Sequence, residues 1–182
     1  SQYPNEYVII SGHLDAFDVA TGGVDCGTGI APMMEAARLI ALSGAKPKRT
    51  IVFVGFAAEE FGLLGAQAYA KTHKDELKNI SYLFNRDGGP TPPIGISVPQ
   101  AMYDDFVEVC KPIKEINPEY PFEVTVAKPR KRPTTTGGTD ASVFDMEGVP
   151  AISFREGDFK GYNFNYGEIW HTERDLYTKS IP

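Results

Sequence analysis

Apolar runs alternate with stretches of mixed polarity along the whole chain, and this pattern predicts an α/β fold. The run at residues 50–57 (TIVFVGFA) is almost continuously apolar, which is typical of a strand buried on both faces in a parallel sheet. Strands that alternate with helices predict a three-layer sandwich with a mostly parallel central sheet. The remaining predicted strands are residues 7–12, 80–85, 122–127 and 151–154, and the predicted helices are residues 30–42, 63–72, 100–115 and 139–146.

The helix ends are marked by residues with special backbone preferences. Thr28 follows a glycine-rich loop and is the predicted N-cap of the first helix, in which Pro32 suits the first turn. Gly44 closes that helix, and Pro112 is expected to weaken the end of the third one. The stretch at residues 129–136 (PRKRPTTT) is predicted to be an exposed loop that borders a substrate cleft.

Composition places the chain among globular proteins of one domain. Its 182 residues are 42% hydrophobic and 12% aromatic, which suffices for a sizeable core. Acidic residues outnumber basic ones by 24 to 18, and this balance argues against a nucleic-acid partner. No apolar run reaches the roughly 20 residues that a membrane span requires. Cys26 and Cys110 form neither a CxxC pair nor a disulfide framework.

Both ends of the chain suggest a segment of a longer protein, truncated at each terminus. The chain enters its first apolar strand already at Tyr7, and it stops at Ile181 and Pro182 without a predicted helix to cover the sheet. We expect residues 1–182 to form one domain. Apolar sheet left uncovered in this way would promote self-association.

Five metal-capable side chains follow predicted strands or lie in the loops beyond them. Because strands of an open α/β sheet end at one common edge, residues far apart in sequence can meet there. Carboxylates and imidazoles without a ligating cysteine suit Zn²⁺, Co²⁺ or Mn²⁺, and five such groups exceed what one ion needs. The sequence therefore predicts a site for two metal ions formed by His13, Asp25, Glu60, Asp87 and His171.

Each of these residues also has an ordinary structural explanation. Asp25 and Asp87 stand beside glycines, where aspartate is common turn chemistry, and a histidine beside Trp170 is often a packing residue. In the HLD motif, the carboxylate of Asp15 could hold the proton of one imidazole nitrogen of His13 while the other nitrogen binds metal. The metal hypothesis therefore depends on all five residues meeting in one place.

Two adjacent acids, Glu59 and Glu60, follow the predicted strand at residues 50–57. They could cap the next helix, because acids are favoured at a helix N-terminus. Alternatively they divide the work of a metal site, since neighbours at a strand-to-helix corner point in different directions. One would then bind metal, and the other would face a water molecule as a general base.

The ordered motifs SGHLDAFD, GGVDCGTG, FAAEEFGLLGAQAYA, NRDGG, GGTDASVF and IWHTERD resemble the dizinc exopeptidase family, which includes bacterial leucyl aminopeptidases and plasma glutamate carboxypeptidase. The resemblance covers nearly the whole chain, and the HLDAFDVATGGVD stretch is most similar to the carboxypeptidase Q branch. It implies a phosphorylase/hydrolase-like zinc peptidase core, two Zn²⁺ ions per chain and a peptide substrate. It also suggests a secreted or periplasmic protein.

The same resemblance implies how the ligands are shared. Asp25 is similar to the carboxylate that bridges both ions. His13 and Asp87 are similar to the other protein ligands of one ion, and Glu60 and His171 to those of the second.

Residues around the ligands are assigned in the same way. Glu59 is similar to the general base of the family, which activates water and returns the proton to the leaving amine. Asp15 is expected to support His13, and Asp175 to support His171. Substrate contacts are expected from Tyr162 or Tyr166, whose phenols could stabilise the oxyanion, and from residues near Gly138, Thr139 and Asp140.

Two positions depart from the family pattern, and two other functions stay open. Cys26 stands where relatives often have Asn or Asp after the bridging acid, and Ala141 stands where a histidine is often found. A glutaminyl cyclase-like acyltransferase would use the same fold with a single zinc ion, and a metal-free relative would be a binding domain. The complete set of five ligands argues against both. No residue distinguishes aminopeptidase from carboxypeptidase activity.

Overall fold

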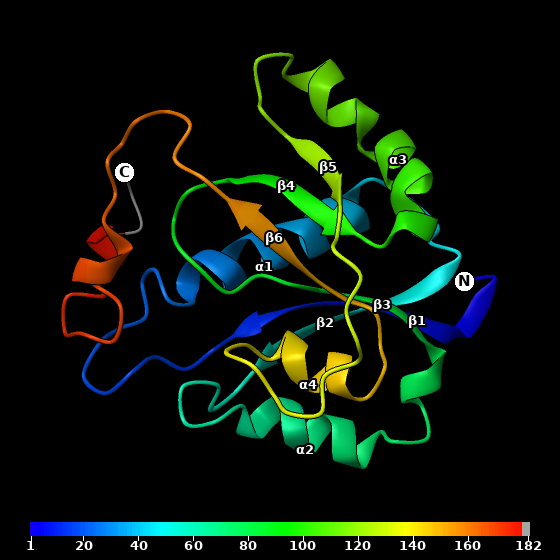
Figure 1. Ribbon diagram of the computed structural model, residues 1–182, viewed down its shortest axis with the longest axis horizontal. Helices are drawn as coiled ribbons and strands as arrows, with labels where there is room; N and C mark the ends of the chain where they lie inside the picture. Colours follow the sequence, from blue (N-terminus) through cyan, green and yellow to red (C-terminus); the bar gives the residue numbers. More distant parts are fainter. Residues whose placement is uncertain (180–182) are drawn as a thin grey trace.

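The computed structural model describes residues 1–179, which form a six-stranded sheet with helices on both faces (Figure 1). The strands are β1 (Tyr3–His13), β2 (Arg49–Phe56), β3 (Ile80–Asn85), β4 (Pro93–Val98), β5 (Glu123–Val126) and β6 (Ala151–Glu156). The helices are α1 (Gly27–Leu42), α2 (Leu64–Thr72), α3 (Tyr103–Ile116) and α4 (Ala141–Met146). Short 3₁₀ turns occur at Leu77–Asn79, Gln100–Met102, Tyr166–Glu168 and Tyr177–Lys179.

The sheet is mostly parallel, as the alternating pattern predicts. Its strand order is β2-β1-β3-β6-β4-β5, and only the β4–β6 pair runs antiparallel. Strand β4 was not expected from the sequence. Strand β2 was expected to be buried on both faces, but it forms one edge of the sheet, and its residues up to Gly55 are only half-buried.

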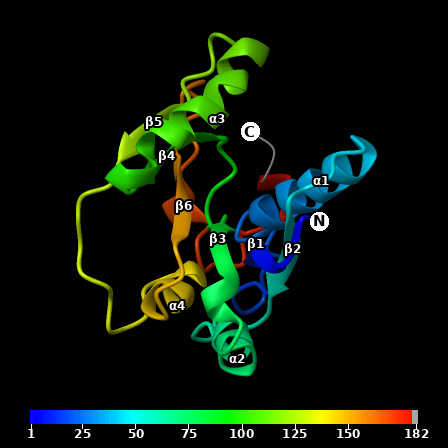
Figure 2. The ribbon, with the colours of Figure 1, turned by 90° about the vertical axis from the view of Figure 1, so that its right-hand side faces the viewer.

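Helices cover both faces, which confirms the three-layer architecture. Figures 1 and 2 show α1 and α3 on one face of the sheet and α2 and α4 on the other. Under α2 and α4, Ile9 and Leu83 of the sheet pack with Phe144 of α4 in one buried cluster. Under α3, Tyr82 and Ile96 belong to a second buried cluster. The apolar layers hold the strand ends, and therefore the loops beyond them, in fixed positions.

One prediction about a helix end is wrong, and another is confirmed to within a residue. Residue Cys26 holds the N-cap position of α1, and Thr28 lies inside the helix, where its Oγ1 lies 2.7 Å from the carbonyl oxygens of both Val24 and Gly88 and can donate to either. Thr28 thus ties the start of α1 to the loop after β3. Helix α3 contains Pro112 and ends at Ile116, one residue beyond its predicted end.

The basic loop at residues 129–136 is largely exposed, as predicted. Arg130 forms an ion pair with Asp145, and Arg132 donates to the carbonyl oxygen of Met146 at 2.6 Å. Both contacts hold the loop against α4. Within the described residues, no helix is long and apolar enough to cross a membrane. The expected truncation at Ile181 and Pro182 concerns residues outside those described.

Candidate dimetal site at the ends of the parallel strands

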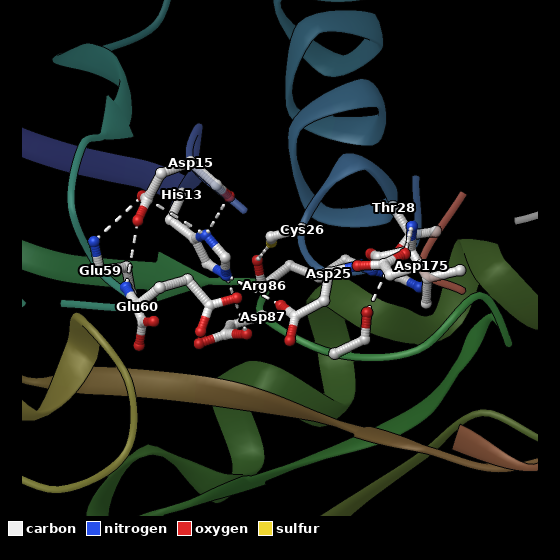
Figure 3. A network of polar contacts seen from close by, with 12 residues as sticks. His13, Asp15, Asp25, Cys26, Thr28, Glu59, Glu60, Arg86, Asp87 and Asp175 are labelled. Carbon is white, nitrogen blue, oxygen red and sulfur yellow. Dashed lines mark hydrogen bonds and ion pairs between the residues drawn. The ribbon is translucent and has the colours of Figure 1, made fainter. Parts of the chain in front are cut away.

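The predicted ligands come together at one edge of the sheet, beyond the carboxyl ends of the parallel strands. His13 is the last residue of β1, Glu60 follows β2, and Asp87 follows β3. Asp25 lies in the loop that leads into α1, and His171 comes from the C-terminal loop. Figure 3 shows the imidazole of His13 directed at Asp25 and Asp87.

One group of donors surrounds the imidazole of His13, whose side chain is only 1% exposed. Its Nε2 lies 2.9 Å from Oδ1 of Asp25 and 3.5 Å from Oδ1 of Asp87. Its Nδ1 lies 3.0 Å from the main-chain oxygen of Asp15, so Nδ1–H donates to that carbonyl. This bond fixes the tautomer that leaves Nε2 available for a metal ion.

A second group lies beside the first and shares Asp25 with it. Nε2 of His171 is 2.8 Å from Oε2 of Glu60, while Oε1 of Glu60 is buried and has no hydrogen-bond partner among the described residues. The candidate ligand atoms of Asp25, Glu60 and His171 all lie within 4.8 Å of one another, as do those of the group that contains His13, Asp25 and Asp87. A buried carboxylate oxygen without a donor is costly, and a cation would satisfy it. The donor set therefore fits two zinc ions.

Cys26 also lies in the first group but is satisfied by protein. Its Sγ falls within the same 4.8 Å cluster, and it donates to the main-chain oxygen of Arg86 at 3.2 Å. The side chain is buried between β1 and α1, and it packs against Gly29. Cys26 thus braces the start of α1 against the Asp87 loop. The other departure from the family, Ala141, is buried as the first residue of α4.

Asp15 supports the site, although not by the contact that was expected. Its carboxylate is 3.7 Å from Nδ1 of His13, and the hydrogen bond to that ring comes from its main-chain oxygen instead. The two carboxylate oxygens accept the backbone N–H groups of Glu59 and Glu60, at 3.0 and 3.1 Å. One side chain therefore fixes both acids of the corner after β2.

The backbone of that corner adopts an unusual conformation. Ala58 and Leu63, which flank Glu59 and Glu60, have φ angles of 56° and 61°, in the left-handed region that non-glycine residues rarely adopt. Such residues cost about 1–3 kcal/mol each and cluster at functional sites. His171 has a φ angle of 57°. Residues in the left-handed region thus lie on either side of Glu59 and Glu60, and His171 is itself in that region.

Asp175 holds Asp25 and not His171, so its predicted role is wrong. Its Oδ1 accepts the N–H of Val24 at 2.7 Å, and its Oδ2 accepts the N–H of Asp25 at 3.1 Å. The contact requires Gly23, because a Cβ there would lie 2.2 Å from the backbone nitrogen of Tyr177. Asp175 is buried and is an anchor for the segment that carries the shared ligand.

Of the two candidate tyrosines, only Tyr166 reaches the site. Its hydroxyl donates to Oδ2 of Asp25 at 2.8 Å, and its ring lines a cavity of about 500 Å³ together with Glu59, Leu63 and Trp170. Burial raises the pKa of Tyr166, and the charge of Asp25 raises it further. Tyr162 is 45% exposed and does not line this cavity.

The predicted substrate-contact segment divides into two parts. Gly137, Gly138 and Thr139 line the cavity, as expected. Asp140 does not; its side chain is 1% exposed, and neither carboxylate oxygen has a hydrogen-bond partner among the described residues. Burial raises the pKa of Asp140 to about 7.

Asp140→Asn should stabilise the protein in the presence of a chelator by up to about 4 kcal/mol at pH 8, and by a smaller amount, about 2 kcal/mol, at pH 5. The pKa of this carboxyl rises from 3.8 to about 7 on folding, so its contribution to stability is lost as pH increases through that range. The amide mimics the protonated acid. Denaturant unfolding at both pH values measures the difference, and a destabilised variant at pH 8 would mean that the carboxylate has a partner.

Several acids lie close together in the site, and they shift the pKa values of its ionisable groups. Burial alone would lower the pKa of His13, but its contacts with Asp25 and Asp87 outweigh this effect and raise it. The two carboxylates thus stabilise positive charge at Nε2, which a divalent cation would supply. Burial raises the pKa of Glu59 to about 8, with a further contribution from the charge of Asp87. Bound cations would reverse that shift.

Some residues of the site were not singled out by the sequence. Phe17 stacks on the imidazole of His171, and Trp170 packs against the same ring. Arg86, beside Asp87, donates to the main-chain oxygen of Thr91 at 2.9 Å and holds the turn after β3. Aromatic rings and arginines occur throughout the chain, so neither role has a signal in the sequence.

The fold and the site together define an α/β protein of the zinc-peptidase class. Residues 1–182 match peptidase family M28, and the chain belongs to this family of metallopeptidases. Its relatives include carboxypeptidase Q and zinc aminopeptidases, which bears out the resemblance seen in the motifs.

Three relatives illustrate the match. Carboxypeptidase Q of Mus musculus is 34% identical over 182 residues, which are 100% of this chain and 36% of that protein. The crystal structure of a peptidase M28 precursor from Shewanella amazonensis SB2B has 35% identity and a TM-score of 0.79, over 98% of this chain and 38% of that one. BSAP, a zinc aminopeptidase from Bacillus subtilis, shares the fold with a TM-score of 0.67 and 24% identity, over 97% of this chain and 41% of that one. The chain thus spans well under half the length of these relatives.

Proposed function

We propose that the chain is the catalytic part of a zinc-dependent exopeptidase that uses two zinc ions and Glu59 as general base. The observation that carries the proposal is the pair of donor groups that share Asp25, with the carboxylate of Glu59 beside them. Glu59 lines the cavity, and its side chain makes no hydrogen bond to any described residue. It is therefore available to a water molecule and a substrate.

The residues of the cavity divide the hydrolysis of a peptide bond among them. Bound zinc supplies Lewis acidity, which makes water acidic enough to ionise near neutral pH and polarises the peptide carbonyl. Glu59 takes the proton of the attacking water and then donates it to the nitrogen of the leaving amine. The hydroxyl of Tyr166 donates to Asp25. If bound ions took up the oxygens of Asp25, that hydroxyl would be free to donate to the oxyanion that forms at the carbonyl.

The charged residues of the cavity favour a substrate whose free amino terminus is bound in the cavity. The ionisable residues that line it are the acids Asp25, Glu59, Glu60 and Asp87, with Tyr166 and His171, and no lysine or arginine lines it within residues 1–179. Three of these acids would be held by the two ions, so the carboxylate that remains to attract an ammonium group is Glu59, whereas a terminal carboxylate would find no lysine or arginine among the described lining residues. We therefore infer an aminopeptidase or dipeptidase in which the free amine of the substrate is bound near the ions.

A single-zinc cyclase and a metal-free binding domain are less well supported. Asp25 belongs to both donor groups, and its two oxygens already contact separate partners, His13 and Tyr166. A one-ion site would leave either Asp87 or the buried Glu60 without a function. In a protein without metal ions, this buried cluster of acids would be destabilising, because nothing would compensate for its charge.

Removal of zinc with a chelator is expected to abolish hydrolysis of dipeptides that have a free amine, and added Zn²⁺ should restore it. The reason is that Glu59 alone cannot polarise a peptide carbonyl. The test uses a panel of free, N-blocked and C-blocked dipeptides, and hydrolysis is measured as the amount of amino acid released. The panel reports both the metal dependence of hydrolysis and the orientation of the bound substrate. Turnover that survives complete removal of metal would contradict the proposal. Faster hydrolysis of N-blocked substrates would contradict the inferred orientation alone.

A further inference from the structure

His171 is the least enclosed of the five candidate ligands. Its side chain is 34% exposed, compared with 1% for His13. Both nitrogens of His13 contact protein atoms, whereas the ring of His171 has one polar contact among the described residues, from Nε2 to Glu60. Asp175, which was expected to orient this ring, binds the backbone of Asp25 instead. Some other contact must set the plane of the imidazole.

Two aromatic rings supply that contact. Phe17 stacks on His171 with 4.4 Å between ring centroids and an interplanar angle of 10°. Trp170 packs against the same ring at 4.1 Å and 31°. Trp170 is adjacent in the chain and moves with His171, whereas Phe17 belongs to the loop after β1. The contact with Phe17 is thus the one that fixes His171 relative to the sheet.

We propose that Phe17 is a positioning residue for the zinc ion bound by Asp25, Glu60 and His171. An imidazole binds metal in the plane of its ring, so rotation of an exposed histidine removes its nitrogen from the ion. A parallel stack restricts that rotation and also reduces the rotamer freedom that binding would otherwise have to remove. The inference rests on the proposed dizinc function and assigns Phe17 to one of its two ions.

The loop after β1 serves both donor groups. It begins at His13 of the first group, and the carboxylate of Asp15 holds the backbone of Glu60 in the second. Phe17 then reaches His171. A change confined to the ring of Phe17 leaves the polar contacts of this loop intact, so its effect should be limited to the second ion.

Stepwise zinc titration of the full chain against a competing chelator tests the proposal. Phe17→Ala should weaken one of the two zinc affinities by about 10- to 100-fold and leave the other unchanged, the usual effect of removing a residue that orients a ligand. Phe17→Tyr keeps the stack and should behave as wild type. Val19→Ala, an exposed position in the same loop, is the matched control and should also have no effect.

The histidine spectrum provides a readout that is independent of metal and of activity. The chain has three histidines, His13, His73 and His171, so their imidazole carbon-bound protons give a small set of NMR signals. The ring currents of Phe17 and Trp170 should shift those of His171 upfield. In metal-free Phe17→Ala they should move downfield, while those of His13 and His73 stay in place.

The outcomes separate this inference from the proposed function. If wild type binds two ions and Phe17→Ala keeps both affinities, or loses both equally, the positioning role is wrong although the dizinc site stands. An unchanged His171 signal in Phe17→Ala would also refute the stack. If wild type takes up no second ion, the dizinc function itself fails.

Discussion

Glu59→Gln is expected to lower kcat by about 10²- to 10⁴-fold while the zinc content stays the same. The amide has the shape of the acid but cannot accept the proton of the attacking water. Because the Glu59 carboxylate bonds to no described residue and its backbone is held by Asp15, the substitution should leave the fold intact. Steady-state kinetics on a dipeptide, with elemental analysis of the same sample, measure both quantities.

The neighbouring acid provides a matched control for this experiment. Glu60→Gln removes a charge from the same corner, yet it should lower the zinc content first and activity as a consequence, because Glu60 pairs with His171 in the second donor group. Excess Zn²⁺ should therefore restore Glu60→Gln in part and Glu59→Gln not at all. Normal turnover by Glu59→Gln would remove Glu59 from the mechanism.

Asp25→Ala should abolish the binding of both zinc ions and, with it, all detectable activity. Asp25 is the residue common to the two donor groups, and its loss leaves His13 and Asp87 on one side and Glu60 and His171 on the other. Two protein ligands are too few for a stable zinc site. Zinc measured after gel filtration should fall from two ions per chain to nearly none.

Asp87→Asn distinguishes a shared ligand from an ordinary one. Asp87 contacts His13 in the first group only, so this variant should retain about one ion per chain, the one held by the second group. Equal metal loss in Asp25→Ala and Asp87→Asn would contradict a bridging role for Asp25. Retention of two ions by Asp25→Ala would contradict the site as a whole.

The helices and strands were predictable where the apolar pattern of the sequence is strong, although the position of β2 at the edge of the sheet was not. The apolar run of β2 and the segments of β3 and β6 have the composition of parallel strands, and α2 was placed to within a residue. Strand β4 was not recognised, because Pro93 and Gly95 lie within its six residues and both disfavour strands. Gly95 is needed because a Cβ there would lie 2.3 Å from the main-chain oxygen of Glu123. That need appears only once β5 is paired with β4.

The convergence of the five candidate ligands could be expected because parallel strands end at one edge of the sheet, and the loops that carry Asp25 and His171 lie at that same edge. The surrounding contacts could not be expected, since they depend on how loops cross in space. The family resemblance paired Asp175 with His171, whereas the fold brings Asp175 to the backbone of Asp25. Likewise, Tyr162 and Tyr166 are equivalent in the sequence, and only the packing of the C-terminal loop selects Tyr166. Asp140 was expected in the cavity wall and lies buried behind it.

The bond from Asp175 to the backbone of Asp25 has a consequence for the order of events during synthesis. A growing chain completes its N-terminal parts first, and contacts between distant segments form late. The segment that carries Asp25 therefore emerges from the ribosome long before its anchor does. Tyr166 follows Asp25 by 141 residues, and His171 follows later still. Metal uptake by both donor groups would then follow translation of residue 175, and a nascent chain released before that residue would lack the anchor of Asp25.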